Sequence, residues 1–408
     1  MTAFDIACAD CGRAMGDPHS VRCVACGGLW RINYGATDEA WPARPLGLWD
    51  YGPWLPIENA ANRVSLGEGG TPLVRATGDG LPAELFWKLE CQNPTGSQKD
   101  RGVSVAISRA LELGARRVLT VSTGSSGLAC AAYAARAGLA AVVLVPEGTP
   151  ASRLAAMQLF GARVIEVEGD FPETYRLLER LVAAPGWTLV ATNRRSNPWQ
   201  AEGTRTLGFE IATEMIAVAG QMPDWIVVPV GGGGTISGVW RGLTEMQAAG
   251  RINRLPRLAA AHAARVDRIA RAVAAGADDD AALAAITNPA ADTVLCNLKG
   301  GARSDLADAV AAIRHSGGRT VAVSEDESLA AQRRLAAEGL FVEPSAAAAE
   351  AAVRTLAADG TLRPGERCVA VLTGSGFRDA IPASGGSLLQ ATPDVPLRRI
   401  EAWLATAP

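Results

Sequence analysis

Lysine is scarce in this chain of 408 residues. Lysine and arginine together number 39, and only Lys88, Lys99 and Lys299 are lysines. Arginine replaces lysine well on most protein surfaces, but its guanidinium stays protonated and does not act as a nucleophilic amine. If the chain uses a side-chain amine in catalysis, the choice is restricted to these three positions.

Strong charge and long apolar runs are also missing. The formal net charge is −3, which gives no electrostatic reason to expect nucleic acid or an anionic membrane as a partner. No apolar run reaches the roughly 18 residues that a transmembrane helix needs. Asp5 stands where a secretion signal would carry basic residues ahead of an apolar stretch. We therefore expect a cytoplasmic protein with no membrane or nucleic-acid partner.

From about residue 84 onward, short β-branched runs alternate with alanine-rich amphipathic stretches. The expected strands are 117–122, 141–146, 163–168, 188–192, 225–230, 319–324 and 367–374. The expected helices include 126–137, 151–160, 201–218 and 345–358. Most strand runs are continuously apolar, which is typical of parallel strands covered on both faces. The pattern predicts doubly wound parallel sheets, more than one at this length. It leaves 256–285 open, as a helix or a mobile lid.

Four of the eight cysteines lie within the first 26 residues. They form two pairs, Cys8-x2-Cys11 and Cys23-x2-Cys26, with eleven residues between the pairs. This spacing is close to that of a zinc ribbon, in which four thiolates close a tetrahedral structural site. We expect residues 1–33 to form such a unit, with structural Zn²⁺ and no catalytic role. The alternative is two incidental pairs or a set of redox thiols.

Three glycine-rich segments follow expected strands, at 122–127, 231–235 and 373–376. Each is expected to precede a helical segment, so each can offer several backbone N–H groups and a helix dipole end to an anion. The glycines at 231–234 are not followed by the Lys-Ser/Thr of a phosphate loop. They also lack the spacing of a dinucleotide fold. Together the three segments indicate a ligand with several anionic groups.

The segment Asn93-Pro-Thr-Gly-Ser-Gln-Lys-Asp-Arg-Gly102 is the most informative part of the chain. Pro94 and Gly96 favour a turn, and Ser97 or Asp100 can cap the helix that follows. Lys99 is then expected at a helix N-terminus, where the helix dipole disfavours its charged form. A lysine of this kind is suited to Schiff-base chemistry.

Asn93-PTGSQKDRG resembles the Schiff-base segment of the fold-type II pyridoxal-phosphate enzymes, and most closely that of the threonine synthase family. The resemblance extends in order along nearly the whole chain. The other matching segments are Ser65-LGEGGTPL, Ser122-TGSSG, Val230-GGGGT, Glu338-GLFVEPSAAAA and Leu372-TGSGFRD. Threonine synthase-like proteins often carry an N-terminal zinc ribbon, so the cysteine pairs fit the same resemblance.

The resemblance implies an α/β fold with two doubly wound, mostly parallel open-sheet domains and a small N-terminal ribbon. The large domain would comprise 34–112 and 193–408, and the small domain 113–192 would be inserted into it. The resemblance also implies bound pyridoxal 5'-phosphate, a small amino-acid substrate and a homodimer.

The resemblance assigns roles to residues of three kinds. Lys99 would be the catalytic, cofactor-linked lysine. The residues implied to hold the cofactor with it are Ser125, Gly231, Gly232, Gly233, Gly234, Thr235 and Thr373. Thr373 would face the pyridine nitrogen, where a neutral hydroxyl makes the ring a weaker electron sink than a carboxylate would. The residues implied to bind the substrate are Ser122, Thr123, Gly124, Ser126, Gln200 and Arg205.

The chain departs from the family pattern at positions that bear on the substrate. Ser125 stands where the family usually has Asn, Gln98 where it usually has Phe, and Ser375 replaces a common His. Gln200 stands where an Arg typically helps to hold the substrate phosphate, whereas Arg205 retains a cation at a common Lys position. The residues implied to bind the cofactor are therefore present, whereas the set implied to bind O-phosphohomoserine is incomplete.

Three functions follow from these residues. The leading one is a threonine synthase-like elimination and replacement on O-phosphohomoserine or a related activated hydroxy amino acid. The second is a serine/threonine ammonia-lyase or a β-replacement enzyme similar to cysteate or cysteine synthases. The third is a ligand-binding relative that has lost catalysis, against which the retained Lys99 argues.

Overall fold

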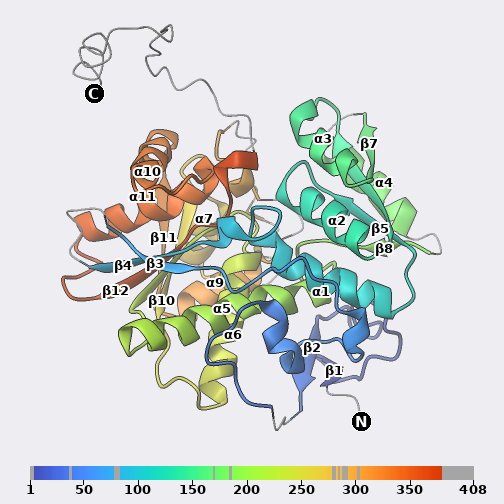
Figure 1. Ribbon diagram of the computed structural model, residues 1–408, viewed down its shortest axis with the longest axis horizontal. Helices are drawn as coiled ribbons and strands as arrows, with labels where there is room; N and C mark the ends of the chain where they lie inside the picture. Colours follow the sequence, from blue (N-terminus) through green and yellow to red (C-terminus); the bar gives the residue numbers. More distant parts are fainter. Residues whose placement is uncertain are drawn as a thin grey trace, which may run out of the picture.

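The computed structural model describes residues 4–35, 39–77, 83–168, 171–182, 186–277, 282–283, 285–286, 293–300 and 304–378. Their strands form a six-stranded, a four-stranded and a two-stranded sheet (Figure 1). The predicted α/β class with mostly parallel sheets is confirmed. Within the described ranges, no helix is long and apolar enough to cross a membrane.

The six-stranded sheet is the centre of the molecule. Its order is β11 (Arg319–Val323), β10 (Arg257–Ala263), β9 (Trp225–Pro229), β12 (Arg367–Val371), β4 (Glu84–Lys88) and β3 (Leu73–Arg75). Only the pairing of β3 with β4 is antiparallel among these strands. The carboxyl ends of β4, β9 and β12 therefore meet at one edge of the sheet, where ligands bind in open α/β folds.

Helices cover both faces of this sheet, as the continuously apolar strands require. Ile226 and Val228 pack in one core beneath α5 (Pro198–Ala219), α6 (Gly234–Ala248), α7 (Arg268–Ala275) and α9 (Leu306–His315). Val227, between them in sequence, packs in the opposite core with α10 (Glu325–Ala337) and α11 (Pro344–Ala358). Figure 1 shows α10 and α11 on one side of the sheet and α5 and α6 on the other.

The four-stranded sheet is wholly parallel, in the order β7 (Arg163–Val167), β6 (Ala140–Pro146), β5 (Arg117–Val121) and β8 (Thr188–Leu189). Its helices are α2 (Ser125–Arg136), α3 (Ala151–Leu159) and α4 (Phe171–Val182). The long helix α1 (Lys99–Glu112) packs against both α2 and α5, so it joins the two sheet layers.

The sequence left 256–285 undecided, and the structure places strand β10 at its start, followed by α7. The strand is hard to recognise because Arg257–Ala263 contains alanine and histidine rather than β-branched residues. The proposed domain boundaries stay a proposal. The four-stranded sheet lies within 113–192 and the two-stranded sheet ends at Tyr34. Residues 379–408 of the predicted large domain lie outside the described residues.

A buried ion-pair network fixes α1 to the central sheet. Arg101 donates from Nε to Glu90 at 2.7 Å and from Nη2 to Glu210 at 2.6 Å. Glu210 also pairs with Lys88 at 3.0 Å, and Lys88 reaches Glu214 at 2.7 Å. The side chains of Lys88, Arg101, Glu90 and Glu210 are fully buried. The network links β4, α1, α5 and the 3₁₀ turn Glu90–Gln92. The Lys88 amine therefore has a structural role.

Replacing Lys88 with Met should destabilise the protein by about 3–5 kcal/mol, because Glu210 and Glu214 would lose a buried counter-charge. Urea unfolding followed by tryptophan fluorescence measures the change. The matched control is Arg319→Met, which removes an exposed pair with Asp359. That variant should lose less than about 1 kcal/mol. Equal losses in the two variants would contradict the role given to the network.

Candidate active site

Lys99 is the first residue of α1, next to the end of β12. The turn before it pairs with the residues after that strand. Gln98 N donates to Thr373 O at 3.1 Å, and Ser375 N donates to Gly96 O at 2.8 Å. Ser97 and Gly374 form an isolated antiparallel bridge. Lys99 and Thr373, both predicted as site residues, are therefore brought to the same edge of the central sheet.

The predicted capping of α1 is only partly observed. The N-cap residue is Gln98, which makes no side-chain cap bond. Ser97 Oγ accepts a hydrogen bond from Lys99 N at 3.3 Å. Asp100 closes the preceding turn instead, because its carboxylate accepts from Thr95 N at 2.6 Å. The carboxylate thus holds the turn that presents Lys99 rather than the helix end.

The Lys99 amine lies in a poorly hydrated environment. Burial lowers its pKa below the usual range, and the nearby carboxylates of Asp305 and Glu343 only partly oppose this effect. A lysine with a lowered pKa carries a larger fraction of neutral, nucleophilic amine at neutral pH. Lys88, by contrast, is held by Glu210 and Glu214.

The glycine loop after β9 is a compact backbone cradle. A Cβ atom at Gly231 would lie 2.7 Å from Asn297 O, and one at Gly233 would lie 2.7 Å from the Cβ of Ala309. Gly233 also has a φ of +89°, which a side chain would strain. It caps α6 without any side-chain bond, so the first amides of α6 are not used by a capping side chain. Such amides bind anions well.

Asp305 lies against this cradle, and no sequence motif had pointed to it. Its Oδ2 atom lies 2.8 Å from the position of a Cβ on Gly234, and its Oδ1 accepts from Arg194 N at 2.8 Å. Burial, followed by the charge of Asp308, raises the pKa of Asp305 to about 7. The carboxyl group therefore changes charge near neutral pH beside the glycine loop.

The loop after β5 forms the opposite wall. It holds Ser122, Thr123, Gly124, Ser125 and Ser126, all partly exposed, at the N-terminus of α2. Ser122 Oγ accepts from Gly124 N at 3.2 Å. Ser126 lies 3.4 Å from Thr192 Oγ1. Gly124 caps the helix without a side-chain bond, so this loop also offers backbone amides to an anion.

A cluster that the sequence did not single out joins this loop to the central sheet. Arg378 donates from Nη1 to Ser125 Oγ at 2.6 Å and forms an ion pair with Glu343. The other oxygen of Glu343 accepts from Asn297 Nδ2 at 2.8 Å. Glu343 and Arg378 lie within two of the segments that resemble the family. They are 35 positions apart, so no local sequence pattern indicates that they form a pair.

Arg205 does not join the site as predicted. Its side chain is fully buried, and each guanidinium nitrogen donates inside the protein, to Glu202, to Glu245 and to the backbone oxygen of Trp54. Its charge is thus neutralised, and we withdraw it as a substrate-binding residue. Gln200 is buried against α1, where a Cβ on Gly102 would lie 2.9 Å from its Oε1.

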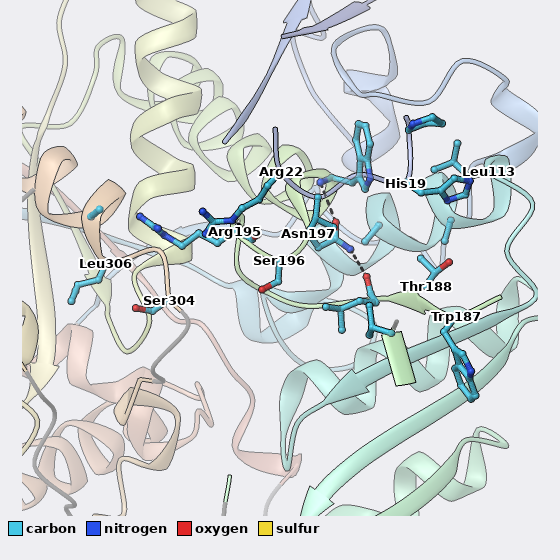
Figure 2. A pocket seen from close by; sticks show the side chains of 18 of the residues that line it. His19, Arg22, Leu113, Trp187, Thr188, Arg195, Ser196, Asn197, Ser304 and Leu306 are labelled. Atoms are coloured by element: carbon cyan, nitrogen blue, oxygen red, sulfur yellow. Dashed lines mark hydrogen bonds between the residues drawn. The ribbon is translucent and has the colours of Figure 1, made fainter. Parts of the chain in front are cut away.

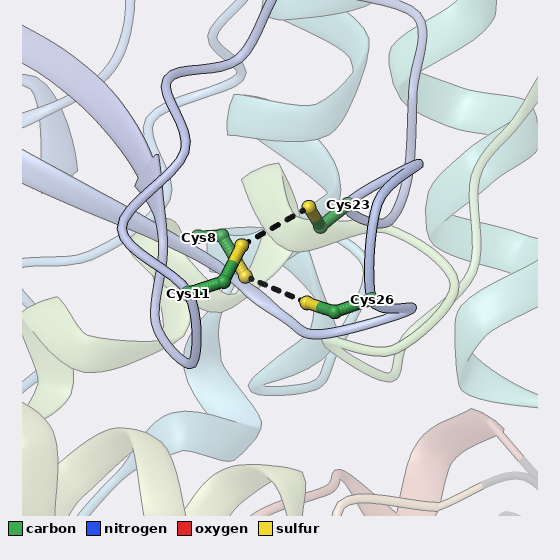
Figure 3. A group of neighbouring side chains, drawn as sticks. All are labelled: Cys8, Cys11, Cys23 and Cys26. Atoms are coloured by element: carbon green, nitrogen blue, oxygen red, sulfur yellow. Dashed lines mark hydrogen bonds between the residues drawn. The ribbon is translucent and has the colours of Figure 1, made fainter.

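The four N-terminal cysteines come together as the spacing predicted (Figure 3). Their Sγ atoms all lie within 4.8 Å of one another. Cys8 is the last residue of β1 (Phe4–Cys8) and Cys11 lies in the turn after it, while Cys23 and Cys26 precede β2 (Trp30–Tyr34). The unit is attached to α5 by a hydrogen bond of 2.8 Å from Tyr34 Oη to Glu202. Four thiolates at this separation suit a tetrahedral zinc ion.

A separate cavity of about 710 Å³ lies between the N-terminal unit, β8 and the N-terminus of α5 (Figure 2). Its walls include His19, Arg22, Trp187, Arg195 and Asn197. None of the predicted cofactor or substrate residues lines it. This cavity therefore does not mark the site, which is defined by the strand ends around Lys99.

Comparison with known proteins identifies the group of enzymes to which this geometry belongs. A family model for pyridoxal-phosphate dependent enzymes matches residues 64–374. A threonine synthase of Methanocaldococcus jannaschii is 36% identical over 385 residues, covering 91% of this chain and 92% of the relative. The threonine synthase of Mycobacterium tuberculosis is 35% identical, with 84% and 91% covered.

Solved structures give the same result for the fold. A threonine deaminase from T.th. superposes with a TM-score of 0.63 and 26% identity, covering 76% of this chain and 94% of that chain. Maize serine racemase superposes with a TM-score of 0.62 and 22% identity, covering 82% and 91%. The chain therefore belongs to the pyridoxal-phosphate dependent enzymes and is similar, over most of its length, to threonine synthases.

Proposed function

We propose that this pyridoxal-phosphate dependent lyase catalyses a threonine synthase reaction on O-phosphohomoserine. The observation that carries the proposal is the convergence of Lys99, the glycine loop and Thr373 at the ends of β4, β9 and β12. The length of the likeness to threonine synthases supports the same reaction.

The residues present fit pyridoxal phosphate. The backbone amides of Gly231–Thr235 would hold its phosphate, Lys99 would bind it covalently, and Thr373 and Ser125 would contact its ring. The bound cofactor would supply an electron sink for reactions at the substrate's α- and β-carbons. The uncapped start of α2, with Ser122, would bind the substrate carboxylate.

Lys99 has the properties of a proton carrier as well as a nucleophile. Its amine has a lowered pKa and sits at the start of a helix fixed by the Arg101 network. Once displaced by a substrate amine, it can take a proton from one substrate carbon and return it to another. The neutral hydroxyl of Thr373 at the ring would favour elimination over transamination.

A serine/threonine ammonia-lyase reaction is the second candidate, because a threonine deaminase shares the fold at 26% identity. The two reactions separate in one assay. A threonine synthase releases phosphate and threonine from O-phosphohomoserine, whereas an ammonia-lyase releases ammonia and a keto acid from serine or threonine.

We also propose that the enzyme is a cytoplasmic homodimer with one structural Zn²⁺ in the N-terminal unit. The sulfur cluster of Cys8, Cys11, Cys23 and Cys26 supports the metal. The family resemblance supports the dimer. The division into a ribbon, a large domain and an inserted small domain belongs to the same proposal.

Borohydride reduction of the cofactor-loaded protein should attach the cofactor to Lys99, because its turn pairs with the residues at Thr373, whereas the Lys88 amine is held by Glu210 and Glu214. Peptide mapping by mass spectrometry locates the label. Lys99→Ala should lose the label and turnover, while Lys299→Met should keep both. A label on Lys88 or Lys299 would show that the site is misassigned.

The charge of Asp305 should limit cofactor affinity above pH 7. With a pKa of about 7, Asp305 is mostly protonated at pH 6 and mostly ionised at pH 8, beside the amides assigned to the phosphate. The charged groups that face Asp305 are Lys99, Arg194 and Asp308, and Asp305→Asn replaces none of these side chains. The variant should therefore bind pyridoxal phosphate severalfold more tightly than wild type at pH 8, with little difference at pH 6. Fluorescence titration measures both affinities, and a pH-independent ratio would be evidence against this role.

Purified protein should contain about one zinc per chain. The double variant Cys8→Ser/Cys11→Ser should lose the metal and unfold at a lower temperature, because metal binding contributes folding energy in so small a unit. Elemental analysis and thermal unfolding test this. Turnover per folded molecule should change little, and its loss in a stable, cofactor-loaded variant would contradict a purely structural role.

A further inference from the structure

Arg378 occupies a position next to the Lys99 turn that only a glycine neighbour permits. A Cβ on Gly96 would lie 2.9 Å from Cδ of Arg378, and Gly96 itself has a φ of +78°. The arginine follows β12 in the 3₁₀ turn Gly376–Arg378. Its side chain is only 13% exposed. The turn that presents Lys99 thus leaves room for the aliphatic part of this side chain.

The guanidinium reaches across to the loop assigned to the substrate. Nη1 donates to Ser125 Oγ at 2.6 Å, and Nη2 pairs with Glu343. The Nε atom is enclosed and has no hydrogen-bond partner among the described residues. A buried donor without a partner is costly, and a ligand that supplies an acceptor removes the cost.

A small cavity of about 40 Å³ opens beside this guanidinium. Its polar lining includes Ser125, Arg153, Asn297, Glu343 and Arg378, and Leu128, Ala156 and Met157 form an apolar wall. Two arginines and an amide facing an apolar wall suit a compact anionic group attached to a short carbon chain. Glu343 offsets one positive charge and fixes the guanidinium plane.

Other arginines near the predicted substrate site are already engaged. Arg205 is held by Glu202 and Glu245. Arg194 pairs with Asp308 at 3.3 Å and donates to Trp30 O at 2.9 Å. Gln200 is uncharged. Arg378 also pairs with Glu343, but its Nε donor has no partner among the described residues, so this arginine can supply the cation that the sequence lacks at position 200.

We propose that Arg378 is a specificity-determining residue that binds the anionic leaving group of the substrate. This inference rests on the proposed function and deepens it, since it names the side chain that recognises the phosphate of O-phosphohomoserine. Ser125 and Glu343 hold the guanidinium in place before binding. The arriving phosphate then takes over donors of Arg378, which bind a phosphate in a bidentate manner.

The test compares a charged and an uncharged leaving group on the same carbon chain. In Arg378→Gln, KM for O-phosphohomoserine should rise roughly 10- to 100-fold, the usual effect of losing a charged hydrogen bond. KM for O-acetylhomoserine should change less than about threefold, since that leaving group carries no charge. Inhibition by inorganic phosphate should weaken in parallel with the first effect. Arg378→Lys should recover part of it, because charge is restored without the bidentate geometry.

Two further variants test the direction of the charge effect and whether it is specific to Arg378. Glu343→Gln removes a negative charge from the cavity and should strengthen inhibition by phosphate. Arg319→Gln, which replaces an exposed arginine paired with Asp359, should leave all constants unchanged. The absorbance of the bound cofactor confirms that each variant is folded and loaded.

Equal losses on both substrates would overturn the inference, because Arg378 would then act on the substrate carboxylate or on the fold. Unchanged constants in Arg378→Gln would overturn it as well. If the natural enzyme makes no threonine from O-phosphohomoserine, the proposed function fails on its own. Calorimetry then still tests whether Arg378 binds an anion. It compares the affinity of inorganic phosphate for the cofactor-loaded wild type and for cofactor-loaded Arg378→Gln. A weaker affinity in the variant supports its role, and an equal affinity refutes it.

Discussion

The pairing of Arg101 with Glu90 and Glu210 is the interaction on which the rest of the site depends. It is made in the interior, between a helix that begins at Lys99 and two elements of the central layer. Charges buried in this way must be matched almost completely, so the geometry tolerates little displacement. The strength of the pairing fixes the direction of α1, and the direction of α1 fixes where the lysine amine emerges.

The same helix connects the two sheet layers, since it packs on α2 as well as on α5. The loop before α2 and the glycine loop before α6 are therefore placed relative to one rigid element. Each loop ends at a helix that no side chain caps, so each keeps amides for a ligand. Positive electrostatic potential comes from backbone geometry here, and it explains why an enzyme with a net negative charge can gather anions at its active site.

Most of the fold could be predicted, because apolar strand runs and glycine-rich turns are local signals. The position of Lys99 at the start of a helix and the gathering of the four cysteines were also predictable, since both rest on short local motifs. Strand β10 escaped prediction because its alanines favour a helix, and burial between β9 and β11 decides its conformation instead. Arg205 was misjudged because family position does not reveal that Glu202 and Glu245 neutralise it. Asp305, Glu343 and Arg378 make contacts between distant segments, which no single-sequence pattern reports.

The burial of Lys88 in an ion-pair network limits how the protein reacts with reagents that modify amines. Its amine is enclosed by Glu210 and Glu214, so two lysine side chains of the chain are left for reagents that seek an amine. One of these is Lys99 at the active site, and the other is the partly exposed Lys299. Acylating, cross-linking and conjugating reagents would therefore find very few lysine side chains to modify. In the cofactor-free protein, Lys99 would be one of the few lysine side chains that such reagents can modify.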